Sequence, residues 1–167
     1  EQGVNLIVTV DNGISAVEEI AYAKTLGIET VVTDHHQVGD ALPDAVAFVD
    51  PHRPDCNLNF KDWAGVGVAF KVVCGLEKGD YSEILNNYAD IIAVGTVADV
   101  VDLKDENRAI VKYGIAKINA CPCNGINALR QVAGVSERAL NAIGVTYSLA
   151  PRINAAGRMG SAKTKGT

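Results

Sequence analysis

Positions 31–36 of the chain read Val31-Val32-Thr33-Asp34-His35-His36. The β-branched residues at the start favour a strand that is buried on both faces, as strands of parallel sheets are. An acid and two imidazoles follow at the carboxyl end of that strand, where open α/β sheets bind their ligands. From these residues alone two interpretations are equally good: a set of metal ligands, or a turn capped by Asp34 beside two surface histidines.

The residues before this stretch place a second acid at the same edge of the sheet. The chain opens on another strand of the buried type, which ends at Asp11. Ser15 stands three residues before Glu18, the spacing of a capping box, and the apolar positions that follow predict a helix over 15–26. A strand, a helix and a strand within about thirty residues form a βαβ unit with parallel strands. Asp11 and His35 would then lie roughly 5 Å apart, so one divalent ion could touch both.

The pattern after the histidines predicts one more strand and then helices. Residues 45–49 read as a short strand, and the acid behind it, Asp50, is either a site residue or, more simply, a turn acid before a proline. Apolar spacing predicts helices over 65–76, after residue 80, and over 107–119, 124–133 and 136–143. We therefore expect an α/β domain with a mainly parallel sheet flanked by helices over residues 1–104, followed by a helical region with a basic end over residues 105–167.

Two positions in these helices allow two interpretations each. Gly65 and Gly67 open a helix, where glycine lets a phosphate or another backbone approach closely, and tight packing against the sheet explains them equally well. Asp99 lies seven residues after Ile92 and extends its apolar stripe, a costly place for a carboxylate that is neither paired nor bound to metal. If the helix instead ends near Gly95, Asp99 is a loop residue.

The charges are divided along the chain. The net charge of −5 argues against a nucleic-acid partner at first sight. Residues 1–50, however, hold nine acids against one lysine, and residues 151–167 hold four bases and no acid. An acidic part that binds metal and a basic end that holds phosphate would suit a metallophosphoesterase, although ordinary surface scatter would give the same counts. No G-x-G-x-x-G or G-x-x-x-x-G-K-[ST] pattern follows the first strand, which argues against the usual nucleotide-binding motifs.

The length and the cysteine content of the chain limit the number of domains and the cellular compartment that we expect. The 167 residues suffice for one domain with a real core, or for one domain and a small extension. No apolar run approaches the ~20 residues of a membrane helix, and four cysteines are too few for a disulfide scaffold, so we expect a cytoplasmic protein with reduced thiols. We expect no signal peptide, and we expect a chain that opens at Glu1 directly before a strand to be part of a longer one.

Five ordered blocks of the sequence resemble the DHH phosphoesterase superfamily and, within it, the bacterial single-strand-specific 5′→3′ DNA exonucleases. The triplet Asp34-His35-His36 resembles the superfamily signature, and Val10-Asp11-Asn12-Gly13 resembles its preceding acidic motif. The other three blocks are residues 64–71, 95–101 and 150–159. Together they span nearly the whole chain.

The resemblance implies metal-dependent hydrolysis of phosphodiester bonds. Two divalent ions, Mn²⁺ or Mg²⁺, would activate a water and neutralise the charge on the phosphate. Asp11, His35 and Asp99 would be the metal ligands, with Asp11 as the bridge between the ions. His36 would contact the scissile phosphate, and Asp34 would orient a histidine.

The resemblance also implies the substrate and its binding residues. Arg152, Asn154 and Arg158 would hold the backbone of single-stranded DNA, and Gly65 would let it approach; without the resemblance, an exposed helix face with solvated arginines is the better interpretation. The activity would serve recombination and repair, with a single-strand-binding protein or a helicase as partner. Two alternatives stay open: a DHH phosphodiesterase of short RNA or cyclic dinucleotides, and a catalytically silent nucleic-acid-binding module.

One departure from the family concerns its first motif. An Asp-x-Asp pair is expected just after the family's first strand, and it would lie upstream of Glu1. The family's DHHA1 domain and oligonucleotide-binding fold are not in this sequence either. We therefore expect the chain alone to hold metal weakly and to cut poorly or not at all.

Overall fold

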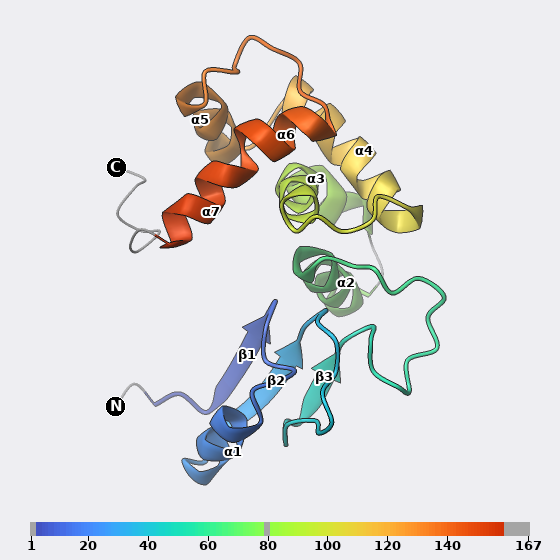
Figure 1. The fold of residues 1–167 in the computed structure, drawn as a ribbon, viewed down its shortest axis with the longest axis vertical. Coiled ribbons are helices and arrows are strands. Elements are labelled where there is room, and N and C mark those ends of the chain that lie inside the picture. Colours follow the sequence, from blue (N-terminus) through green and yellow to red (C-terminus); the bar gives the residue numbers. More distant parts are fainter. Residues whose placement is uncertain (1–2, 79–80, 159–167) are drawn as a thin grey trace. The chain divides into compact units, whose positions relative to one another are not determined.

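A computed structural model describes residues 3–78 and 81–158 of the chain. The chain divides into two compact units, Glu1–Asp80 and Tyr81–Thr167. The first unit contains the sheet and the second contains helices alone among the described residues (Figure 1). This division concerns packing, and the functional domains that we expect over 1–104 and 105–167 stay a prediction.

The sheet of the first unit is parallel, as predicted. Its three strands are β1 (Leu6–Val10), β2 (Glu29–Thr33) and β3 (Ala47–Val49), in the order β1-β2-β3. The strands end in line, because Val10 pairs with Thr33 and Thr33 pairs with Val49. The next residue along each strand is an aspartate, so Asp11, Asp34 and Asp50 stand at one edge of the sheet.

Two helices accompany the sheet, α1 (Val17–Thr25) and α2 (Gly65–Leu76). The bounds of α2 agree with the prediction, but the capping box at Ser15 is wrong, because Ala16 is the N-cap residue and no side chain caps the helix. A tertiary contact fixes the start of α1 instead. Ile14 is buried, and its N–H donates to the Asp34 carboxylate at 2.9 Å.

Strand β1 is less buried than its apolar sequence predicted. It is an edge strand among the described residues, with β2 on one side only. Its apolar side chains Leu6, Ile7, Val8 and Val10 are between 38% and 54% exposed, whereas Val32 in β2 is fully buried. Burial on both faces therefore holds for the central strand and not for β1 in this chain.

The second unit contains five helices among its described residues. They are α3 (Tyr81–Ala98), α4 (Asp105–Ala120), α5 (Asn124–Val132), α6 (Ala142–Ser148) and α7 (Ala150–Arg158). Their core gathers buried aliphatic side chains, among them Val97, Val111, Ile118 and Leu149. No helix of the described residues is long and apolar enough to cross a membrane.

The helix predicted over 136–143 is wrong. The helix α6 begins only at Ala142, where the side chain of Asn141 accepts the N–H of Gly144 at 2.8 Å. The preceding segment is held by Arg130, which is buried and donates to the carbonyls of Ser136 and Arg138. The N–H of Leu140, which a helix in this place would direct to the Ser136 carbonyl, donates instead to Asn119 Oδ1 at 2.8 Å.

Arg130 provides a test of this packing. It also donates to the Ile118 carbonyl at 2.5 Å, so Arg130→Met would leave three carbonyls without their charged donor. We expect the free energy of unfolding to fall by about 3 kcal/mol, measured by urea denaturation with circular dichroism. Arg108→Met, at an exposed position of α4, is the control and should stay within about 0.5 kcal/mol of wild type. Equal stability of both variants would show that Arg130 does not organise this segment.

Candidate metal centre

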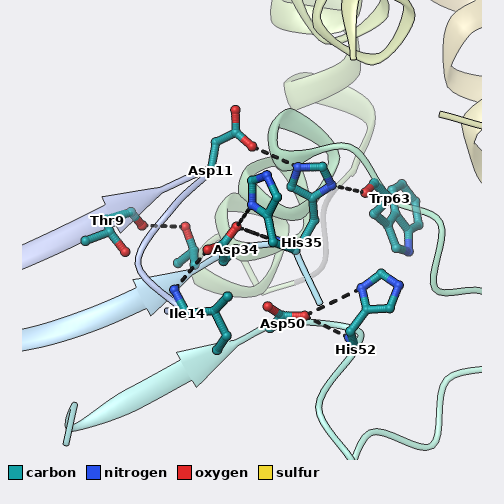
Figure 2. A network of polar contacts seen from close by, with 10 residues as sticks. Thr9, Asp11, Ile14, Asp34, His35, Asp50, His52 and Trp63 are labelled. Carbon is teal, nitrogen blue, oxygen red and sulfur yellow. Dashed lines mark hydrogen bonds and ion pairs between the residues drawn. The ribbon is translucent and has the colours of Figure 1, made fainter. Parts of the chain in front are cut away.

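Asp11 follows β1 in a loop that turns sharply. Its own φ is 63°, in the left-handed region, and its N–H donates to the Thr33 carbonyl at 3.0 Å. Gly13 has a φ of 110°, and a Cβ on it would lie 2.6 Å from Thr9 Oγ1, so this loop requires glycine there. The backbone thereby holds the Asp11 carboxylate beside His35, which follows the end of β2 (Figure 2).

His35 presents one ring nitrogen to Asp11. Its Nδ1 lies 2.9 Å from the Trp63 carbonyl oxygen, and because that oxygen can only accept, Nδ1 must carry the proton. When the ring is neutral, Nε2 then has a lone pair, and it lies 3.0 Å from Asp11 Oδ1 (Figure 2). Two acceptors at this distance repel each other unless a proton or a cation stands between them. Imidazole nitrogen and carboxylate oxygen are ligand atoms of divalent metals, so this pair fits a metal ion.

Asp34 organises the edge of the sheet from below the surface. The residue is 1% exposed, and its Oδ2 accepts the Ile14 N–H at 2.9 Å. Its Oδ1 accepts the His35 N–H at 2.8 Å and lies 2.7 Å from His36 Nδ1. Burial by itself would raise the pKa of Asp34, but these hydrogen bonds outweigh burial and leave the pKa lowered. Asp34 is therefore an ionised acceptor whose two oxygens are both engaged by the protein.

The ligand atoms of four predicted site residues converge. One such atom from each of Asp11, Asp34, His35 and His36 lies within 4.8 Å of the others. The side chain of His36 is 59% exposed, so its ring is open to a substrate while Asp34 holds it from beneath. Gly65, at the start of α2, lies directly against the Asp11 carboxylate. Close packing of Gly65 is therefore confirmed, with Asp11 as the neighbour. The contact of Gly65 with a substrate stays a prediction.

The other predicted site residues belong to the second unit. Helix α3 ends at Ala98, and Asp99 is an exposed residue just behind it, whose N–H donates to the Gly95 carbonyl. The prediction that Asp99 extends the apolar stripe of the helix is therefore wrong, and Asp99 is a loop residue. Arg152 and Asn154 are exposed on α7, and Arg152 donates to the Ser148 carbonyl at 2.6 Å. Their approach to Asp11 and His35 stays a prediction, and the side chain of Arg158 lies outside the described residues.

Sequence reasoning missed the contact of Trp63 with His35 and the burial of Asp50. Trp63 is the only tryptophan of the chain and is 4% exposed, and it orients His35 through its backbone carbonyl, which no side-chain pattern reveals. Asp50 is buried, accepts the His52 N–H at 2.8 Å through Oδ1, and has no partner for Oδ2 among the described residues. The turn before Pro51 was predicted, but the burial of its acid was not.

The buried position of Asp50 changes its titration. Burial raises the pKa of the Asp50 carboxyl, the His52 N–H offsets part of the rise, and the charge of Asp34 adds to it. The folded chain then binds a proton more tightly than the unfolded chain. The contribution of Asp50 to stability is therefore greatest below the unfolded pKa of about 3.9 and is lost as pH rises through the folded pKa.

Asp50→Asn should remove this pH dependence, because an amide keeps the oxygen that accepts the His52 N–H and loses the charge. We expect the variant to be more stable than wild type at pH 7, and the difference to vanish near pH 3. Urea unfolding followed by Trp63 fluorescence measures both. Asp44→Asn, at an exposed acid paired with Lys24, is the control and should change little at either pH. A variant less stable than wild type at pH 7 would show that the buried charge itself is needed.

Comparisons with known proteins show the family of the chain. Residues 3–96 match the DHH family, N-terminal domain. The single-stranded-DNA-specific exonuclease RecJ of Salmonella typhimurium is 45% identical over 170 residues, which cover 95% of this chain and 30% of that protein. RecJ of Bacillus subtilis is 43% identical over 159 residues, which cover 95% of this chain and 20% of that protein. The chain thus spans less than a third of the length of these relatives.

Solved structures give the same relationship. The crystal structure of exonuclease RecJ bound to manganese matches with a TM-score of 0.80 and 39% identity, over 95% of this chain and 40% of that one. The crystal structure of RecJ from Thermus thermophilus in complex with Mn²⁺ matches with a TM-score of 0.79 and 40% identity, over 95% of this chain and 24% of that one.

Proposed function

The chain belongs to the DHH family, and we propose that it forms the metal-binding part of a 5′→3′ exonuclease that hydrolyses the phosphodiester bonds of single-stranded DNA. The observation that carries this proposal is the 3.0 Å contact of His35 Nε2 with Asp11 Oδ1, which brings two possible metal ligands together beside Asp34 and His36. The relatives are named as exonucleases specific for single-stranded DNA, which supports this substrate. Two of the matched structures contain manganese, which supports the metal.

The ligand atoms suit Mn²⁺ or Mg²⁺, which when bound would activate a water and neutralise charge on the phosphate. Asp11 and His35 would hold the metal from the ends of β1 and β2, with Asp99 as a further ligand. Both carboxylate oxygens of Asp34 accept hydrogen bonds from the protein, and Asp34 would position His36. The ionised Asp34 accepts a hydrogen bond from His36 Nδ1, and the exposed ring would contact the scissile phosphate.

The basic end of the chain would bind the single-stranded DNA. Arg152 and Asn154 are exposed on α7, and with Arg158 they would hold phosphates of the DNA backbone. Such an activity serves recombination and repair, where a single-strand-binding protein or a helicase would be its partner.

Hydrolysis of 5′-labelled single-stranded DNA by the complete protein tests the reaction, with duplex DNA and short RNA as competing substrates. Asp11→Asn, His35→Ala and Asp99→Asn should each lower the Mn²⁺-dependent rate by roughly 100-fold or more, because removing only an outer partner of a metal ligand already costs 10–100-fold. Asp44→Asn is the matched control and should keep the rate. Full activity of the Asp11 or His35 variant, or a preference for short RNA, would refute the proposal.

Arg152 provides a separate test of strand binding. Arg152→Ala in the complete protein should weaken binding of 5′-phosphorylated single strands without sequence preference, because phosphate contacts carry no sequence information. The log–log slope of affinity against salt should flatten by roughly one unit for the lost contact. Arg108→Ala is the control, and Mn²⁺ affinity should stay unchanged in both. Unchanged DNA affinity of the Arg152 variant at low and at moderate salt would mean that this arginine is a solvated surface residue.

A further inference from the structure

We propose that Gly65 and Gly67, the glycines of the first turn of α2, are positioning residues that hold the metal ligands Asp11 and His35 in place. The proposal rests on the metal-binding function above and adds to it the element that sets the geometry of the ligand pair.

The glycines are not needed for the backbone of α2. Neither Gly65 nor Gly67 has a positive φ, so any residue could adopt their conformation. Glycine inside a helix costs roughly 0.5–1 kcal/mol relative to alanine, so two glycines in one turn weaken the helix. The reason for them must therefore lie in what stands next to the helix.

Gly65 lies against the whole side chain of Asp11. A Cβ on Gly65 would be 2.2 Å from Asp11 Oδ1, 2.4 Å from Cγ and 2.6 Å from Cβ. A rotation of the carboxylate alone could not relieve this overlap, because the Asp11 Cβ is also too close. The Asp11 backbone is in turn tied to the Thr33 carbonyl. Any side chain at position 65 would therefore displace Asp11 Oδ1 from its place 3.0 Å from His35 Nε2.

Gly67 acts on the other ligand through Trp63. A Cβ on Gly67 would be 2.6 Å from Cε3 of the Trp63 ring. That ring is buried, with the Phe60 ring edge-on at 5.4 Å and Lys71 Nζ at 4.8 Å from its centre, so it has little room to withdraw. Displacement of Trp63 would move the carbonyl that fixes the proton on His35 Nδ1. The lone pair on Nε2 depends on that proton.

The same helix contains a glycine without such a neighbour. Gly75, near the end of α2, would meet no atom within 4 Å if it carried a Cβ. Close contact is thus confined to the end of α2 that touches the ligands. Gly75→Ala is therefore a matched control, and on helix propensity alone it should leave the chain as stable as wild type or more so.

The first experiment measures metal affinity. Gly65→Ala and Gly67→Ala should weaken Mn²⁺ binding by roughly 10–100-fold in calorimetry, the range seen when an outer partner of a metal ligand is lost. Gly75→Ala should bind Mn²⁺ like wild type. The alternative role of Gly65 is to let a phosphate of the DNA approach closely. Binding of 5′-phosphorylated single-stranded DNA in EDTA tests this role without metal. Normal Mn²⁺ affinity of Gly65→Ala together with weakened strand binding in EDTA would overturn the proposal.

The second experiment is a double-mutant cycle in the absence of metal. Urea unfolding followed by Trp63 fluorescence should show that Gly65→Ala destabilises the wild-type chain but not the Asp11→Gly variant, where the overlapping side chain is gone. Glycine is also suited to the positive φ of position 11. Equal destabilisation in both backgrounds would refute the contact. This cycle decides about Gly65 even if the wild-type chain binds no Mn²⁺, a result that would refute the proposed function instead.

Discussion

The rest of the site depends on the hydrogen bonds that the buried carboxylate of Asp34 accepts. Leaving an ionised carboxylate without hydrogen bonds in this place would cost several kcal/mol, so the groups that donate to it fix the backbone around it. One oxygen holds the Ile14 N–H in the loop behind β1, and the other holds His35 and His36 behind β2. The two loops that carry the candidate ligands are thereby tied to one residue.

The ligand pair is set mainly by backbone groups. The Trp63 carbonyl accepts from His35 Nδ1 and so sets the tautomer of the ring, and the Thr33 carbonyl accepts the Asp11 N–H. The first turn of α2 packs closely against Asp11 and the Trp63 ring. Such preorganisation is what a metal site needs, because ligands that are already in place lose little freedom on binding. The sheet edge, the loop behind β1 and the start of α2 therefore act as one unit.

The sequence predicted what local patterns and chain topology determine. Period and length predicted the βαβ unit and the bounds of α2, and the right-handed crossover placed Asp11 and His35 at one edge. Predictions failed where a contact joins residues distant in sequence: Ile14 with Asp34 replaces the capping box at Ser15, and Arg130 holds the segment over which a helix was predicted. The role of the Trp63 carbonyl could not be predicted from side-chain patterns, and the approach of Asp99 to the site is a tertiary question of the same kind.

The location of a bound ion would decide whether Asp11 and His35 are the ligands. Crystals of the chain soaked in MnCl₂ can be measured at the manganese absorption edge, where anomalous scattering marks the ion itself. We expect a peak within about 2.5 Å of both His35 Nε2 and a carboxylate oxygen of Asp11, which is the range of metal–ligand distances in proteins. A peak coordinated by Asp34 and His36 without Asp11, or by His35 through Nδ1, would contradict the arrangement described for this site.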